Sequence, residues 1–304
     1  MRLPRLGQRP VLVVLSGALA IAFSGILFRV SHVSPSTGAF YRCVWALPPL
    51  WLLARWEDSR FGPRPRHARV TAWIAGAFFA ADLVLWHNAI DQVGAGLATV
   101  LGNTQVVLVG IVTWLIVGER PSRSALLAIP VVAVGVVLIS GALERGAYGS
   151  NPPLGALFGV LTGLANTGFL IALREGNRDL RRPAGPLFDA TFAAAIGCAA
   201  IGVAVGDLDL TPSLSATAWL IVLALTSQVF GWLLISVSLP RLPAAHASVM
   251  LTFQPVCSVL FAALLLGESP SRLQLAGAAC IVAGLVVASL RSHRIPVPEP
   301  ELAG

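Results

Sequence analysis

Ten stretches of about 20 mainly apolar residues run through this sequence, separated by short segments that hold most of its charges. A helix needs roughly 20 apolar residues to cross the hydrocarbon core of a bilayer. The pattern therefore predicts an all-α integral membrane protein with ten transmembrane helices. The expected spans lie near residues 11 to 30, 36 to 55, 70 to 90, 94 to 117, 123 to 141, 153 to 173, 185 to 205, 215 to 238, 244 to 267 and 272 to 291.

The composition argues against a soluble fold. The chain is 56% hydrophobic and 12% charged, which leaves too little polar surface to cover a soluble domain. Its net charge of +7 comes from 21 arginines and no lysine, spread over the short segments, so nucleic acid is not an expected partner. The four cysteines lie far apart inside apolar runs. No disulfide, metal site or cofactor is therefore predicted.

Arginine placement predicts the orientation of the chain. With the N-terminus in the cytoplasm, seventeen arginines lie in cytoplasmic segments and three lie outside. Because positively charged loops stay in the cytoplasm, both termini are expected there, in a multi-pass protein of the cytoplasmic cell membrane. The Pro-rich tail, residues 292 to 304, is expected to be extended and mobile. A cleaved signal peptide is an alternative for the first span, but cleavage would leave nine spans.

Two corners of the sequence are almost identical. Residues 118 to 123 are GERPSR and residues 267 to 272 are GESPSR, which places Glu119 and Glu268 149 positions apart. Both glutamates are expected to be solvated turn carboxylates, with a bond to the start of the next helix as an option. The same offset relates further pairs of residues: Gln105 and Gln254, Gly135 and Gly284, and Thr99 and Ser248. The chain therefore contains an internal repeat, residues 11 to 141 and 153 to 291.

Each repeat holds an odd number of expected spans, five, so the second copy must enter the membrane from the opposite side. Such inverted five-helix repeats are common in secondary transporters, and their substrate site lies near the membrane midplane between the two halves.

These residues resemble the drug/metabolite transporter superfamily, in particular its EamA-type members. The resemblance covers residues 11 to 291 and rests on the two G-E-x-P-S-R corners, the glycines that follow them, and Pro35 followed by Arg42. It implies a ten-helix carrier that moves small metabolites or drugs, often outward. The family often has a proline in both corner-bearing helices. Here Pro255 has Val106 at its repeat-related position, which argues against symmetric bending of the halves.

Asp82 is the most informative polar residue, because it lies near the middle of the third expected span. An ionised carboxylate there costs about 2.5 to 3.5 kcal/mol, so such residues usually face protein or a water-filled cavity. Trp86 follows four residues later, and Gln228 and Trp232 show the same spacing in the eighth span. We predict that Asp82 carries a coupling proton beside the two indoles, with a structural hydrogen bond to a neighbouring helix as the alternative.

Four small polar residues predict where the cargo binds. Thr99 and Asn103 share a face of the fourth span, and Ser248 and Thr252 share a face of the ninth. Because the two faces are related by the repeat, we expect them to line a common cavity. Thr99 and Ser248 fit equally well with helix packing, since hydroxyl residues let membrane helices approach closely.

Two further side chains belong to the candidate site. Arg42 lies within the second span and is either a clamp for a substrate carboxylate or a side chain that reaches the interface. His87, beside Trp86, either carries a proton or completes a helix end. Asp207 and Asp209 belong to an outer loop and are expected to be solvated.

Other polar and small residues fit structural roles. Gln105 and Gln254 lie about 200° around their helices from the polar faces, so they are expected to bond neighbouring helices. Gly155, Gly159 and Gly163 form overlapping G-x-x-x-G patterns, which predict close helix contact in the sixth span.

The predicted function is alternating-access export of a small polar or amphipathic metabolite, with coupling to protons. No nucleotide-binding motif, G-x-S-x-G elbow or H-E-x-x-H pair is present, so neither ATP-driven pumping nor enzyme activity is expected. The alternatives are a carrier of sugar phosphates or nucleotide sugars and a membrane scaffold without transport. The expected partners are a small molecule and the lipid bilayer, and the sequence is compatible with both a monomer and a homodimer.

Overall fold

The chain is described by a computed structural model that covers residues 10–118, 121–176, 179, 181–238 and 244–289. For residues 10, 11, 117, 238, 244–251 and 289 the description is of the backbone alone. Glu119 and the predicted mobile tail, 292 to 304, lie outside the described residues.

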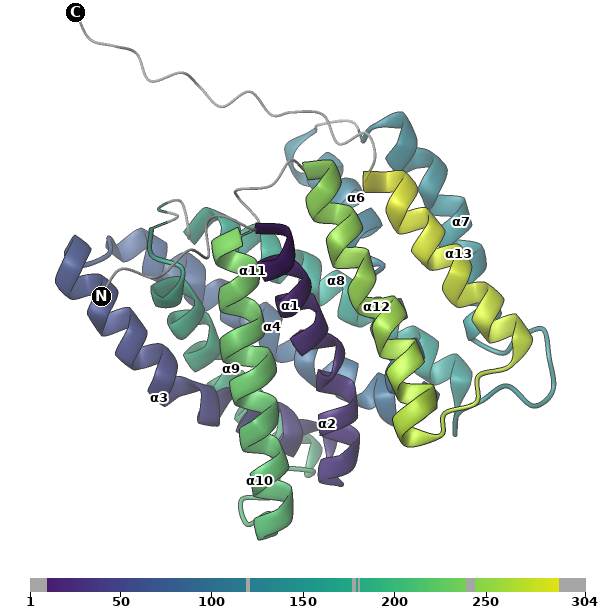
Figure 1. The fold of residues 1–304 in the computed structure, drawn as a ribbon, viewed down its shortest axis with the longest axis horizontal. Helices are drawn as coiled ribbons and strands as arrows, with labels where there is room; N and C mark the ends of the chain where they lie inside the picture. The colour runs from purple at the N-terminus through teal and green to yellow at the C-terminus, as the bar shows by residue number, and fades with distance from the viewer. Residues whose placement is uncertain (1–9, 119–120, 177–178, 180, 239–243, 290–304) are drawn as a thin grey trace, which may run out of the picture.

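Every regular element among the described residues is helical (Figure 1). In chain order they are α1 (Pro10–Ala22), α2 (Ser24–Ser31), α3 (Pro35–Phe61), α4 (Arg66–Val93), α5 (Ala95–Gly102), α6 (Gln105–Val117), α7 (Arg123–Ile139), α8 (Pro152–Gly176), α9 (Ala184–Val205), α10 (Leu214–Leu223), the π-helix η2 (Ala224–Gly231), α11 (Trp232–Ser238), α12 (Ala244–Leu266) and α13 (Arg272–Ser289).

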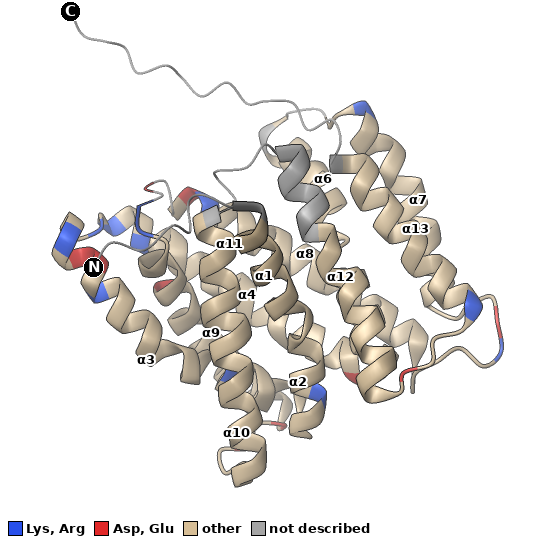
Figure 2. Cartoon of the chain, viewed as in Figure 1, with Lys and Arg blue, Asp and Glu red and all other residues tan. Residues whose placement is uncertain are grey.

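Six helical stretches are long and apolar enough to cross a membrane, and three shorter apolar helices accompany them. The six are Leu12–Ser31, Arg66–Val93, Ala95–Ile116, Pro152–Gly176, Ala184–Val205 and Leu214–Val237; the shorter ones are Arg123–Ile139, Thr252–Leu266 and Arg272–Ala288. Helix α3 is long as well, but it carries Arg42 and a charged C-terminal end. Figure 2 shows that most charged residues lie near the ends of the helices, as expected when the helix middles contact hydrocarbon.

Helices α7 and α13 begin 149 residues apart and pack against each other, and their contacts repeat the same offset (Figure 1). A Cβ atom at Gly135 would lie 2.7 Å from Ile281 Cγ1, and one at Gly284 would lie 2.6 Å from Val132 Cγ2. Ile281 is the repeat partner of Val132, so one antiparallel contact is made twice. Antiparallel packing of related helices is what an inverted repeat requires.

Helices α3 and α9 cap each other's first turns with acids. Glu57, in the last turn of α3, accepts hydrogen bonds from the backbone nitrogens of Ala184 and Gly185 at 2.9 and 2.8 Å. Asp207, just after α9, accepts from the backbone nitrogen of Ser36 at 3.2 Å. Ser36 and Gly185 are again 149 residues apart. The expectation that Asp207 is only solvated was therefore wrong, because its carboxylate satisfies an orphan donor of α3.

Replacing Glu57 by alanine should lower the free energy of unfolding by about 1 to 3 kcal/mol, because two buried N–H groups of α9 lose their acceptor. The neighbouring Asp58 is the matched control. Its side chain is 42% exposed, and its ion pair with Arg182 is long, at 4.0 Å. Asp58→Ala should therefore change the free energy of unfolding by less than about 0.5 kcal/mol. Thermal unfolding of the purified variants measures both effects, and equal losses would contradict the capping role.

Glu268 forms a third cap, at the kink between α4 and α5. Its carboxylate accepts from the backbone nitrogens of Ala95 at 2.6 Å and Gly96 at 3.2 Å. The side chain is buried, so the prediction of a solvated carboxylate was wrong for Glu268, and the helix start that it bonds is that of α5 and not that of the next helix, α13. Burial raises the pKa of this carboxyl above its ordinary value, and the two N–H donors only partly oppose that shift. Gly94, with a φ of 89°, lets the chain turn sharply between the two helices.

Candidate functional site

Several of the expected spans are interrupted, contrary to the continuous helices that the sequence predicts. The fourth span breaks at Asn103 and Thr104, between α5 and α6. The first span breaks at Phe23, and the eighth passes through the π-helix η2. By contrast, α12 stays helical through Pro255. Irregular backbone at membrane depth is tolerated where it is buried in protein or lines a cavity, and π-helical turns occur frequently at functional sites.

The glycine face of α8 accommodates the break in the fourth span. A Cβ atom at Gly163 would collide with Thr104 Oγ1, and one at Gly159 would collide with the side chain of Leu101. Close contact through these G-x-x-x-G glycines is as the sequence predicts. It brings α8 against the interrupted backbone.

A cavity of about 220 Å³ lies beside this break and is lined from both halves of the chain. We call it the central cavity. Its polar and aromatic lining includes Arg42 from α3, Asp82 and Trp86 from α4, Thr99 and Asn103 from the fourth span, Asn166 from α8, Trp232 from α11 and Gln254 from α12.

Two opposite charges are buried at the central cavity. Arg42 is 3% exposed and Asp82 is 5% exposed. The Nε of Arg42 donates to Gln228 Oε1 at 3.2 Å, and Asp82 Oδ2 accepts from Asn166 Nδ2 at 3.2 Å. Among the described residues, no ion pair within 4.0 Å joins the two charges. Each is therefore held by a neutral amide and not by the other.

The guanidinium of Arg42 is further fixed by its surroundings. Its Cζ lies 5.7 Å from the centre of the Trp86 ring, close enough for a cation–π interaction. Gln228, which accepts from Arg42, donates through Nε2 to Thr191 Oγ1 at 3.1 Å. A chain of hydrogen bonds thus runs from α9 through η2 to α3 and fixes the direction of the guanidinium.

Aromatic side chains form one wall of the central cavity. Trp232 packs edge-on against Phe169 with ring centres 5.3 Å apart and against Phe79 with ring centres 6.2 Å apart. Trp86 is buried and also faces the cavity. The i,i+4 spacing of Asp82 and Trp86 on α4 therefore presents a charge and an indole to one space.

Both halves of the chain match one known protein family. Residues 8–141 and 153–290 each match the model of the EamA-like transporter family. The chain belongs to this family. Together with the apolar helices, membership identifies a multi-pass membrane protein and a transporter of the drug/metabolite type.

This EamA-like transporter also resembles solved structures. One, described only as a crystal structure of a protein, has a TM-score of 0.60 and 16% sequence identity, and the match covers 93% of this chain and 97% of that chain. At such low identity the likeness supports the fold alone. No match was found among curated proteins.

The EamA-like transporter places some predicted site residues away from the central cavity. His87 is fully buried, its ring stacks on Phe28 at 3.9 Å, and its Nδ1 lies 3.0 Å from the carbonyl oxygen of Pro35. Thr252 is buried but does not line the cavity, and the side chain of Ser248 lies outside the described residues. Gln228 is not a lining residue of the cavity, but it accepts a hydrogen bond from Arg42, which is. Roles for these residues in binding or coupling stay predictions.

Gln105 lines the central cavity, contrary to the expectation that it points away. That expectation assumed a continuous helix, whereas Gln105 is the first residue of α6, directly after the break. Its Oε1 is buried and has no hydrogen-bond partner among the described residues. Gln254 lines the cavity as well, so both members of this repeat-related pair lie at the cavity and not on a face turned away from it.

Asn166 and Thr191 were not predicted from the sequence. Asn166 is a polar residue within the apolar sixth span, which by itself was a usable signal. Thr191 stands 149 residues after Arg42, so the repeat offset could have drawn attention to it.

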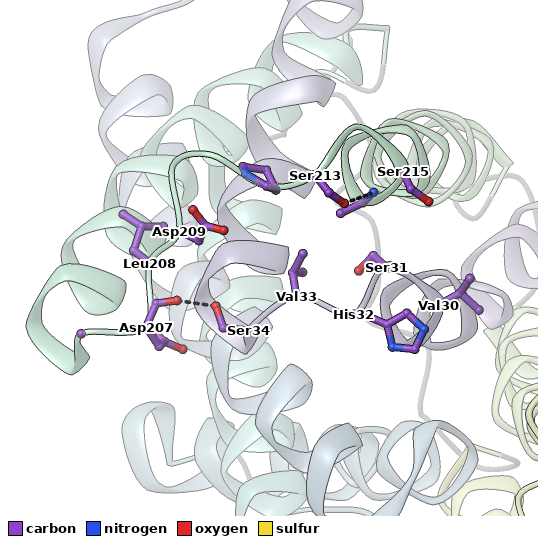
Figure 3. Close-up of a pocket in the computed structure, with 13 residues that line it drawn as sticks. Val30, Ser31, His32, Val33, Ser34, Asp207, Leu208, Asp209, Ser213 and Ser215 are labelled. Atoms are coloured by element: carbon purple, nitrogen blue, oxygen red, sulfur yellow. Dashed lines mark hydrogen bonds between the residues drawn. The ribbon is translucent and has the colours of Figure 1, made fainter.

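A second hollow, of about 510 Å³, lies between the loop after α2 and the loop after α9 (Figure 3). Asp207 and Asp209 line it, but both use their oxygens for local structure. The carbonyl oxygen of Asp207 accepts from Ser34 Oγ, and Asp209 Oδ1 accepts from the Thr211 nitrogen at 2.8 Å. Asp209 is therefore not simply solvated either. Among the described residues that line this hollow, there is no buried pair of opposite charges like that of the central cavity.

Proposed function

We propose that this chain is a secondary transporter that exports a small polar or amphipathic metabolite across the cytoplasmic membrane by alternating access. The observation that carries the proposal is the central cavity, where Arg42 and Asp82 meet interrupted helices from both halves. Transporters of inverted-repeat design bind their cargo at such sites, formed by discontinuous helices near the midplane.

In this proposal the chain crosses the membrane ten times, with both termini in the cytoplasm. The antiparallel packing of α7 on α13 and the mutual capping of α3 and α9 support it. Because each of these contacts occurs in two repeat-related copies, the two halves meet through nearly equivalent interfaces. Rocking of one half against the other can then open the cavity to either side in turn.

We further propose that Asp82 exchanges a proton for the cargo. The carboxylate is enclosed by helices and lines the cavity, so its protonation can be linked to occupancy. Its charged neighbour is Arg42 on α3, and the thiols of Cys43 on α3 and Cys198 on α9 lie in the same buried region. On α4 itself, His87 points instead toward Pro35.

Larger anionic cargoes fit the central cavity poorly. A sugar phosphate or nucleotide sugar calls for several cations, and Arg42 is the one arginine among the lining residues that the structure describes. The volume of about 220 Å³ is also below the roughly 300 to 1,000 Å³ of pockets for drug-sized ligands. A scaffold without transport would have no need of two buried charges at a cavity, since each is expensive in a membrane.

Purified protein in liposomes tests the proposal. We expect it to move at least one solute from a broad panel of small metabolites, at a rate that depends on an imposed pH gradient. Empty liposomes and liposomes that contain an unrelated folded membrane protein serve as controls. No movement of any solute above these controls would contradict the proposed function.

A further inference from the structure

We propose that the contact between α5 and α12 is the outer gate of the transporter and that Glu268 is its latch. The gate closes the path from the central cavity to the outside, and it separates when the cavity opens outward. This inference rests on the proposed function, because alternating access and the proposed topology define which end of the molecule is the outer one.

Three contacts join α5, in the first half, to α12 and the corner after it, in the second half. The carboxylate of Glu268 accepts from the backbone nitrogens of the first two residues of α5 at 2.6 and 3.2 Å. Gly96 lies so close to α12 that a Cβ atom there would be 2.9 Å from Val259 Cα. One turn further along α5, Ser258 Oγ donates to Thr99 Oγ1 at 3.1 Å. The two helices are therefore in contact from the end of α12 to the level of Thr99.

This contact lies on the outer side of the central cavity. Helix α12 ends on the same side of the molecule as α2, and the proposed topology places that side outside (Figure 1). Thr99 and Gly102 of α5 line the central cavity, whereas Ala95 and Gly96 are not among its lining residues. The hydrogen bonds of Glu268 are therefore made between the cavity and the outer end.

Helix α5 can move as a unit because a hinge lies at each of its ends. Gly94, with a φ of 89°, precedes it, and the break at Asn103 and Thr104 follows it. Between the hinges α5 has eight residues, a length of about 12 Å. Residues at the ends of elements absorb the changes in φ and ψ when parts of a protein move. A movement of α5 away from α12 would therefore open the outer contact and shift the cavity wall at Thr99 together.

Glu268 suits a latch because its hydrogen bonds are strong and can be replaced by bonds to water. A carboxylate that accepts from backbone N–H groups makes charge-assisted hydrogen bonds, which are stronger than neutral ones. The first N–H groups of a helix have no acceptor within their own helix. When the halves separate, water can bond both the carboxylate and the start of α5, so the latch can break and form again in each cycle.

Thiol labelling of the full-length protein in sealed membrane vesicles tests the latch. Ser258→Cys places a thiol inside the contact, because Ser258 is fully buried. A membrane-impermeant methanethiosulfonate added to right-side-out vesicles should reach this thiol only when the gate is open. Protein without the added cysteine is the blank for the native thiols. We expect Glu268→Gln to speed labelling at least about fivefold, because the amide has one acceptor oxygen and no charge.

Two controls separate a released latch from a damaged fold. Asp209→Asn removes an exposed carboxylate that accepts from Thr211 in its own loop, so it should leave the labelling rate unchanged. Inside-out vesicles expose the opposite face of the membrane. A damaged fold would raise labelling from both sides, whereas a released latch should raise it from the outside alone. An unchanged outside rate for Glu268→Gln, or an equal rise from both sides, would overturn the latch.

A reversible cross-link tests the gate itself. A Cβ atom at Gly96 would lie 3.4 Å from the Cβ atom of Ala262, close to the roughly 3.5 to 4.5 Å that a disulfide requires. We expect the oxidised protein with Gly96→Cys and Ala262→Cys to transport at least about tenfold more slowly in liposomes, because the gate cannot open. Reduction with dithiothreitol should restore transport. Each single-cysteine variant, treated with the same oxidant, is the control.

The two experiments separate this inference from the proposed function. Transport by the fully cross-linked protein at the rate of the reduced protein would overturn the gate and leave the proposed function standing. If the wild-type protein moved no solute, the proposed function would fail, and labelling of Ser258→Cys would still confirm or overturn the latch.

Discussion

Asp82→Asn is expected to abolish accumulation of the cargo against its gradient when a pH gradient drives transport. Asparagine keeps the size of the side chain and can still bond Asn166, but it cannot release or take up a proton. A difference of one pH unit is worth about 1.4 kcal/mol for one proton, or roughly tenfold accumulation of cargo. We therefore expect an accumulation ratio of roughly ten for the wild-type protein and about one for the variant.

The measurement uses liposomes with the membrane potential held at zero and compares steady-state accumulation with and without the pH gradient. The ratio of the two accumulations separates proton coupling from cargo binding, because weaker binding slows transport both with and without the pH gradient. Asp91→Asn is the matched control, since Asp91 lies on the same helix, is 35% exposed and pairs with Arg29 at 3.1 Å. Accumulation by Asp82→Asn at the wild-type ratio would eliminate the coupling role.

Much of the architecture follows from the repeat in the sequence. The offset of 149 residues that relates Glu119 to Glu268 also relates Gly135 to Gly284, and both glycines lie in the contact between α7 and α13. The reason is physical: a contact between related helices is made twice, so both copies need a small residue at the same place.

The helix breaks could not be predicted in the same way. No proline marks the fourth span, yet it is interrupted at Asn103 and Thr104, whereas α12 continues through Pro255. Packing against the glycine face of α8 accompanies the break, and that is a tertiary contact that local propensity does not contain. Because the break rotates α6 relative to α5, the face assigned to Gln105 was wrong.

The helix end that Glu268 caps could not be predicted from the sequence either. The turn at Glu268 is evident from its glycine, proline and serine neighbours. Its partners, Ala95 and Gly96, lie more than 170 residues earlier in the chain. A turn motif indicates where the chain reverses, but not which distant helix end receives the carboxylate.

Gln228→Glu is expected to weaken cargo binding strongly, and with it transport at low cargo concentration, by giving Arg42 an internal counter-ion. The Oε1 of Gln228 already lies 3.2 Å from Arg42 Nε, so a carboxylate in its place would form a buried, charge-assisted hydrogen bond. The guanidinium would then be neutralised from within the protein. A cargo carboxylate, the ligand that the sequence predicts for Arg42, would have to compete with the new carboxylate. A hydrogen bond to a charged group contributes about 1.5 to 3 kcal/mol, which corresponds to a roughly 10- to 150-fold loss of cargo affinity.

Two milder substitutions separate this effect from loss of packing. Gln228→Met keeps most of the volume without adding charge, and Thr191→Val removes the hydroxyl that accepts from Gln228. Thr191→Val should weaken cargo binding less than about threefold, because Arg42 keeps Gln228 as its acceptor. Gln228→Met should weaken cargo binding more than Thr191→Val and less than Gln228→Glu. Dissociation constants and initial transport rates of the three variants give the order. If Gln228→Glu bound the cargo as tightly as wild type, Arg42 would not be a contact for a cargo anion, because a neutralised guanidinium cannot serve as one.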